Sequence, residues 1–464
     1  MAGQYWRRIK LVACLVAGCC LLAGSALALE LGGVELSLHS TTKYQYQWSD
    51  KPANFMLNQD DSDQDLFETL NADARWAEHN LSFSSMMTYS KDLDGTRQGS
   101  IFQDYIDTRD HRDIFECYFA YLEKSGLFDD KLTIRAGRQY AYGAETIQFD
   151  GLWTHLDIPQ FWNMEIEGFG GRAVTHYSHL GPKGIGGANL RIHPFSGLTA
   201  ELNTVIFEET SWEGAVYWQP AENWNLRSRI AFINDHTRNI DLSLTTTIPA
   251  TETTFDFSFF RRYAISSEAD FLFDFTYTLD EALSDKAHNL YLMQEEGYLE
   301  FDARISQPIK WVDGLTLFVR YTNHSLADQD DENLYNSNFQ RLSFGFDLDE
   351  GITWEGFHLS AGYSRWWEDR DIFYEEESSS WSVDVTQKFL SRFEVSAGYY
   401  HKTEDINSLT ENEATTSWHS AISYKICNHS SIELEYEYDQ SDYYEDELGV
   451  DHINSLTVSL DLDF

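Results

Sequence analysis

Hydrophobic and polar residues alternate along most of this chain. In the stretch 34–48, one parity is mostly apolar or aromatic and the other is polar throughout. Alternation with a period of two predicts a β-strand that has one apolar face and one face in contact with water. The same pattern recurs at 198–206, 224–232, 271–277, 299–305, 315–321, 383–389, 393–399, 418–426 and 432–438. The sequence therefore predicts an all-β protein.

The connections between these strands alternate between short and long. Short turns are expected at 193–197, 219–223, 390–392 and 428–430, and long acidic loops at 49–65, 91–112, 323–337, 365–379, 402–414 and 440–452. A series of antiparallel hairpins with short turns at one end and long loops at the other is typical of an up-and-down transmembrane β-barrel, with short periplasmic turns and long extracellular loops. We count about 22 strands, but those between 145 and 260 are blurred, so we predict an even number of roughly 18–22.

The alternation continues to the last residue, through "NSLTVSLDLDF" at 454–464. Lipid offers no hydrogen bonds to the backbone, so the last strand of a membrane-spanning sheet must pair with the first. A terminal aromatic residue such as Phe464 resembles the C-terminal signature of outer-membrane barrels. Aromatic residues also gather near strand ends, as at 44–48 and 436–438, which is typical of the girdles at membrane interfaces. A soluble sandwich or propeller would also alternate, but its polar face would lie outside.

The first residues predict export. Basic residues at 7–10 precede an apolar run, which closes on Ala26-Leu27-Ala28, a pattern that signal peptidase cuts. We therefore expect 1–28 to be a cleaved signal peptide and 29–464 to form a single barrel domain. Two alternatives remain open, a retained membrane anchor and a lipoprotein in which Cys19 is lipidated.

Composition and charge exclude other classes. The formal net charge is −43, which would repel the phosphates of nucleic acid, and 42% of the residues are apolar, which argues against a disordered acidic chain. Only Cys117 and Cys427 lie outside the predicted signal, so a disulfide framework is not expected. The chain contains no Cys-x-x-Cys-His motif for attached haem, and the acidic stretch 61–65 lacks the Gly and Glu that a calcium loop needs at later positions. We expect no cofactor and no specific metal site.

In a transmembrane barrel of this size, the polar parity faces the interior. It supplies basic side chains from several strands, and an acidic column in which neighbouring residues are roughly 7 Å apart. The candidate pore-lining residues are Arg135, Arg138, Arg227, Arg229, Arg304, Arg320, Arg341, Asp274, Glu433, Glu435 and Glu437. A wall of mixed ion pairs, with no dedicated pathway, is an equally good interpretation of these charges.

The segment "TIRAGRQYAYG" at 133–143 differs from its surroundings. It places Arg135 and Arg138 on opposite parities, with Gly137 between them. Together with the following Phe149-Asp150-Gly151, it resembles the alginate-export and related porin-like barrels. The resemblance implies that this arginine region contributes to the wall or constriction of a pore. The acidic balance of the chain departs from what an exporter of an anionic polymer needs. We also expect 158–171, which lacks clear alternation, to fold inward as a constriction loop.

The sequence thus predicts an outer-membrane channel of a Gram-negative bacterium. It would pass small hydrophilic solutes or ions by diffusion, with some preference for cations. One alternative is a barrel that sheathes a partner, such as the porin-like part of a porin–cytochrome electron conduit. Another is an export channel for an acidic polysaccharide, which requires the arginines to form one continuous track. Lipid and small solutes are the expected partners, a homo-oligomer or a partner protein is possible, and an enzyme is not expected, although 176–178 has the His/Ser spacing of barrel phospholipases.

Overall fold

The computed structural model describes residues 29–31, 33–50, 62–95, 102, 106, 113–143, 146–174, 184–207, 209–263, 297–327, 338–350, 355–369, 376–406, 413–442 and 449–463. No helix among them is long and apolar enough to cross a membrane. The predicted strand at 271–277, the predicted signal peptide at 1–28 and Phe464 lie outside the described residues.

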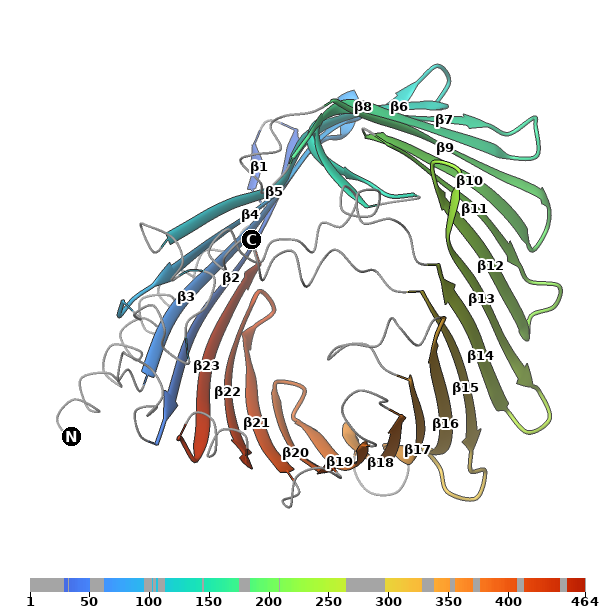
Figure 1. Cartoon of the computed structure of the whole chain (residues 1–464). Helices are drawn as coiled ribbons and strands as arrows, with labels where there is room; N and C mark the ends of the chain where they lie inside the picture. Colours follow the sequence, from blue (N-terminus) through green and yellow to red (C-terminus); the bar gives the residue numbers. More distant parts are fainter. Residues whose placement is uncertain are drawn as a thin grey trace.

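The described residues form antiparallel strands that wind once around a ring (Figure 1). Among the described residues, a 3-10 turn, Ala77–His79, lies between two of these strands. The strands are β1 (Leu29–Leu31), β2 (Val34–Ser49), β3 (Ser62–Trp76), β4 (Leu81–Asp92), β5 (Asp113–Leu127), β6 (Leu132–Ala141), β7 (Ile147–Ile158), β8 (Met164–Ala173), β9 (Gly184–Phe195), β10 (Leu198–Phe207), β11 (Glu209–Trp218), β12 (Trp224–Ile233), β13 (His236–Ile248), β14 (Thr253–Arg262), β15 (Tyr298–Pro308), β16 (Leu315–Leu326), β17 (Asn338–Asp349), β18 (Phe357–Asp369), β19 (Glu376–Phe389), β20 (Phe393–Ile406), β21 (Glu413–Cys427), β22 (Ser430–Ser441) and β23 (His452–Asp463).

The ring is closed by its first and last long strands. Each strand from β2 to β23 pairs with the next, and β23 pairs back with β2 over eleven positions, from His39 opposite Asp463 to Ser49 opposite Ile453. Among the described residues, β2 to β23 make a closed antiparallel barrel of 22 strands. The predicted fold class and even strand number are confirmed. The short β1 pairs with the start of β2, at the edge that β23 leaves free.

The two faces of the barrel differ in polarity, as the alternation predicts. Residues such as Leu317, Val319, Leu342, Phe344 and Leu434 are large, apolar and exposed on the outer face. The alternate residues of the same strands are mostly charged or hydroxylated and point to the interior. An exposed apolar belt around a closed sheet has no stable arrangement in water, and it matches the hydrocarbon core of a membrane. The chain is therefore built as a transmembrane β-barrel.

The ends of the barrel are unequal, and several strands are longer than the sequence predicts. The turns at 196–197, 390–392 and 428–429 are short, as expected. At the other end β18 and β19 continue to Asp369 and from Glu376, into the expected loop at 365–379. Polar residues occupy both faces there, as do the adjacent Trp366 and Trp367, so alternation is lost although the strands still pair. The Arg365–Glu377 ion pair, at 2.5 Å, lies in this extension. Backbone hydrogen bonding thus extends the sheet beyond its amphipathic part.

Candidate functional site

The interior wall is identified by the face opposite the exposed apolar belt. On β12, Ile230 is exposed on the outer face, so Arg227 and Arg229 point inward. The guanidinium of Arg229 lies 3.6 Å from Glu213 and 3.3 Å from Asp241, on the strands at either side. Arg227 lies over the ring of Tyr217 on β11, at 5.7 Å. The structure therefore places both of these predicted residues on the interior wall.

Arg135 of β6 also lies on the interior face. It donates from Nη2 to Glu123 on β5 at 2.7 Å. Its guanidinium lies 4.3 Å from the ring centre of Tyr121 and 4.6 Å from that of Trp153. Ion pairing and two aromatic neighbours hold this side chain in one position.

Arg138 has the opposite parity to Arg135, at the point where β6 bends into the ring, and its expected place in the pore lining stays a prediction. Its position on β6 has the parity of the outer face, where the neighbouring Leu122 and Leu152 are exposed. It forms a two-pronged ion pair with Asp150 at 2.8 and 3.0 Å. The odd spacing between Arg135 and Arg138 already implied opposite faces, because side chains alternate along a regular strand.

A second basic group lies on β15, β16 and β17. Arg320 donates to Asp302 at 2.6 Å. Arg304 lies over Phe318 at 4.9 Å, and Arg341 lies over Trp366 at 4.8 Å while donating to the Ser343 hydroxyl at 3.2 Å. Together with serines of β17 to β19, these arginines line a pocket of about 330 Å³. Basic and hydroxyl groups are thus concentrated on this part of the wall.

Acidic side chains form a column on β22. Glu433, Glu435 and Glu437 share its interior face, opposite the outward Leu434 and Tyr436. The residues paired with them are Ser423, Ala421 and His419 on β21, and Ser459, Thr457 and Ser455 on β23. Within the part of the chain that the structure describes, no ion pair joins these three glutamates to a basic side chain. The remaining predicted site residue, Asp274, lies outside the described residues, as does the 176–178 segment.

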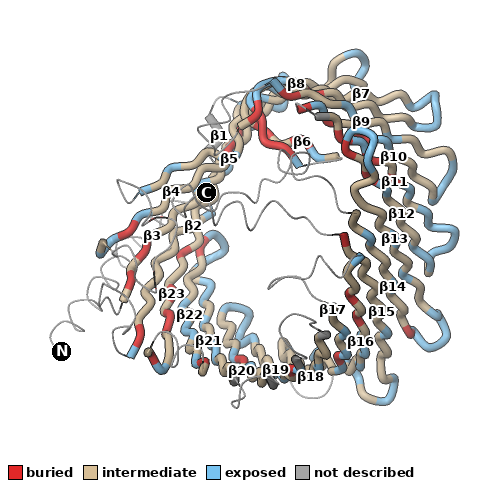
Figure 2. Tube along the Cα trace, in the orientation of Figure 1, coloured by how far each residue is buried: buried red, intermediate tan, exposed pale blue. Residues whose placement is uncertain are grey.

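The ends of β6 and β7 fold into the ring, where Figure 2 shows them as buried segments. Ile147 and Phe149 of β7 are fully buried, at 0% exposure. They belong to an apolar cluster on the interior face, and the rings of Phe149 and Phe169 are 5.3 Å apart. The other members of the cluster are Ala141, Ala173, Ile185, Val205, Phe207 and Ile233. The folded-in hairpin end therefore packs against the inner wall formed by β8, β9, β10 and β12.

Glycines at paired positions allow this bend. Gly137, which has a φ of +133°, pairs with Gly151, and Gly151 pairs with Gly171. A Cβ added at Gly151 would lie 2.3 Å from the carbonyl oxygen of Gly170, so any larger side chain would push the strands apart. Without side chains at these positions, the sheet can bend sharply across three strands.

The expected constriction loop at 158–171 is wrong. Those residues form the end of β7, a turn at 159–163 and most of β8, which pairs with β7 and β9 as part of the wall. The inward element is instead the opposite end of the β6–β7 hairpin. The sequence does hold a signal for it. Val205-Ile206-Phe207 and Ala231-Phe232-Ile233 are apolar on both parities, which marks a wall that is covered from inside.

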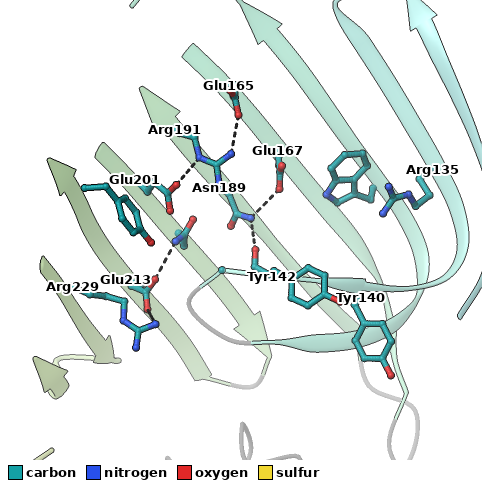
Figure 3. Close-up of a pocket in the computed structure, with 14 residues that line it drawn as sticks. Arg135, Tyr140, Tyr142, Glu165, Glu167, Asn189, Arg191, Glu201, Glu213 and Arg229 are labelled. Atoms are coloured by element: carbon teal, nitrogen blue, oxygen red, sulfur yellow. Dashed lines mark hydrogen bonds and ion pairs between the residues drawn. The ribbon is translucent and has the colours of Figure 1, made fainter. Parts of the chain in front are cut away.

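Between the folded-in end and the inner wall lies a cavity of about 410 Å³ (Figure 3). Sequence reasoning singled out Arg135 and Arg229 but missed the acids and amides that line it. Arg191 of β9 links Glu165 of β8, at 3.0 Å, with Glu201 of β10, at 2.5 Å. The amide of Asn189 donates to Glu167 at 3.2 Å and to the Tyr142 carbonyl at 2.8 Å. Alternation along each of the strands β8 to β11 could have placed these residues on the interior face.

A small acidic cluster lies at the loop end of the β3–β4 hairpin. Asp63, Asp92 and Asp94 each place a carboxylate oxygen within 4.8 Å of the others. The backbone amides of Asp94 and Gly95 donate to Asp92 at 3.0 and 2.6 Å. An acidic cluster alone does not establish an ion site.

No protein-family model and no curated protein matches the chain. Among solved structures it is similar to OccAB4 of Acinetobacter baumannii, with 12% identity, a TM-score of 0.45 and coverage of 93% of this chain and 98% of that one. It is also similar to OprD of Pseudomonas aeruginosa, with 10% identity, a TM-score of 0.42 and coverage of 95% and 99%. A third is OccK1 (OpdK) of the same organism, with 9% identity, a TM-score of 0.44 and coverage of 92% and 99%. At these identities, they assign a role to no residue of this chain.

Proposed function

We propose that this protein is a channel of the Gram-negative outer membrane, which passes small hydrophilic solutes or ions by diffusion. The observation that carries the proposal is the closed ring with an apolar outer belt and a charged interior wall. Such a wall keeps water and polar solutes in the interior, while the belt faces lipid. Residues 1–28 are the proposed cleaved signal for export.

The folded-in end of the β6–β7 hairpin supports selection by size. It occupies part of the ring and rests on a buried apolar cluster, so the cross-section of the interior is reduced by a fixed element. A channel narrowed in this way should discriminate among solutes near the size of a sugar or an amino acid.

The proposal is tested with purified protein in liposomes. Swelling should be fast with a small solute such as glycine, slower with disaccharides, and absent with a large dextran. Protein-free liposomes provide the control. Equal rates with glycine and with the dextran, or no swelling with either, would refute a diffusion channel.

We further propose that the channel prefers cations. The acidic column of Glu433, Glu435 and Glu437 has no ion-pair partner among the described residues. Three of the interior arginines, Arg135, Arg229 and Arg320, each lie beside a carboxylate, whereas three others lie over aromatic rings, and the formal net charge of the chain is −43. Unpaired carboxylates raise the local cation concentration more than paired arginines raise that of anions.

Replacing all three column glutamates with glutamine should reduce the preference for K⁺ over Cl⁻ by roughly twofold, because three negative charges leave the wall. The reversal potential in a KCl gradient measures this change. The matched control is Glu68→Gln, since Glu68 lies on the outer face and accepts hydrogen bonds from Ser40 and Thr42 at 2.6 and 2.5 Å. Equal shifts in both variants would show that the column does not set selectivity.

The arrangement of the arginines favours this function over export of an acidic polysaccharide. Four interior arginines, on β6, β9, β12 and β16, each pair with one or two carboxylates. An anionic polymer would meet a wall of mixed charge, with no continuous basic track. A barrel that sheathes a partner protein can be distinguished from a diffusion channel by purification, because the partner would have to co-purify with the barrel.

A further inference from the structure

The cavity between the folded-in hairpin end and the inner wall is a preformed site in the proposed channel. Tyr142 and Gly143, just beyond β6, lie across β9, where Tyr142 accepts the 2.8 Å hydrogen bond from Asn189. A Cβ on Gly143 would lie only 2.8 Å from the Oδ1 atom of Asn189. The cover and the wall of the cavity are thus fixed to each other, and its volume of about 410 Å³ is in the range of small-ligand pockets.

Four carboxylates and three guanidinium groups line this cavity, those of Glu165, Glu167, Glu201, Glu213, Arg135, Arg191 and Arg229, so the carboxylates are in excess by one. Arg191 is shared between Glu165 and Glu201, so one positive charge faces two negative ones. Arg229 is likewise shared between Glu213 and Asp241. Among the described residues, the carboxylate of Glu167 is joined by longer contacts, with Asn189 at 3.2 Å and His155 at 3.4 Å. A bound group should therefore carry positive charge and several hydrogen-bond donors.

Aromatic side chains also line the cavity. Tyr140 and Tyr142 both line the cavity and stack with centroids 6.2 Å apart, and Tyr142 is 67% exposed. An exposed ring face binds the flat, weakly polar side of a sugar ring and attracts an ammonium group. Carboxylates and amides beside it can accept from and donate to hydroxyl groups.

We infer that this cavity binds an amino sugar, that is, a hydroxylated ring carrying a primary ammonium group. The inference rests on the proposed channel function and adds to it a saturable site, which simple diffusion does not require. Glu165 and Glu167 hold the ammonium group, and Tyr142 packs against the ring.

The test is the block of ion current through the intact barrel by glucosamine, with glucose and ethanolamine as comparison solutes. Glucosamine should block in a saturable way and bind at least tenfold more tightly than either, because each comparison solute lacks one of the two features. If glucose blocks the current as strongly as glucosamine, the site does not require an ammonium group. If ethanolamine blocks it as strongly, the site does not require a sugar ring. Either result would overturn the inference of an amino-sugar site.

Variants connect the block to this cavity. Glu165→Gln combined with Glu167→Gln should weaken glucosamine binding roughly ten- to a hundredfold, since charge-assisted hydrogen bonds are lost. Tyr142→Ala should also weaken it, while Tyr142→Phe and Glu68→Gln on the outer face should retain it. Unchanged affinity in the double variant would overturn the site. Because the current without glucosamine reports folding and channel function separately, a barrel that conducts but is not blocked refutes this inference alone. If no current is seen, calorimetric titration of the detergent-solubilised barrel with glucosamine decides it, and absence of binding overturns it.

Discussion

Phe149→Ala should raise the single-channel conductance, because Phe149 anchors the folded-in end of the β6–β7 hairpin inside the ring. Its side chain is fully buried and packs on Phe169, with 5.3 Å between the ring centres. Truncating a buried Phe costs about 3–5 kcal/mol. The lost free energy comes from the contacts that hold the hairpin end to the wall, because Phe149 belongs to the small apolar cluster between them. The hairpin end should therefore detach while the barrel remains closed.

The measurement is the conductance and current noise of the variant in planar bilayers. Phe115→Ala provides the control, since Phe115 is 66% exposed on the outer face of β5 and should leave the conductance unchanged. A Phe149→Ala barrel with the conductance and noise of the unmodified protein would contradict a constriction formed by this hairpin.

Leu242→Arg should destabilise the barrel by about 2–4 kcal/mol, the cost of a basic side chain near the middle of the lipid-facing belt. Leu242 is 43% exposed on the outer face, midway along β13. The matched variant is Thr245→Arg on the same strand. Thr245 is exposed on the interior face and donates to Asp256 at 2.7 Å, so an arginine there meets a carboxylate and water. It should cost less than about 1 kcal/mol.

Urea unfolding of both variants in lipid vesicles measures this difference. The comparison tests which face is in lipid, because the two residues lie on one strand and receive the same side chain. Equal destabilisation, or a larger effect of Thr245→Arg, would mean that the faces are assigned the wrong way round.

Alternation predicted the fold because one face of each strand meets lipid along most of the barrel. Alternation did not identify strands in places where the two faces do not meet lipid on one side and water on the other. Around Val205 and Phe207 the interior face is covered by the folded-in hairpin, so both faces are apolar and the strands look blurred in the sequence. At the ends of β18 and β19 neither face meets lipid, so real strands resemble polar loops.

The site was predictable only in part. Parity identified the interior placement of Arg135, Arg229 and Glu435, but not their partners, because pairing between strands depends on register. The β-bulge that shifts the register of β4 and β5 between Met86 and Met87 has no clear sign in the sequence. The inward bend depends on glycines from three strands meeting in register, and the alternation pattern does not show which glycines pair.

The most direct test of the central claim is the current carried by the purified, unmodified protein in a planar bilayer under a KCl gradient. The account predicts stepwise insertion, a steady conductance and a reversal potential of the sign given by cation preference. A reversal potential of the opposite sign would contradict the role of the acidic column on β22. Absence of any current from correctly folded barrels would contradict the channel itself.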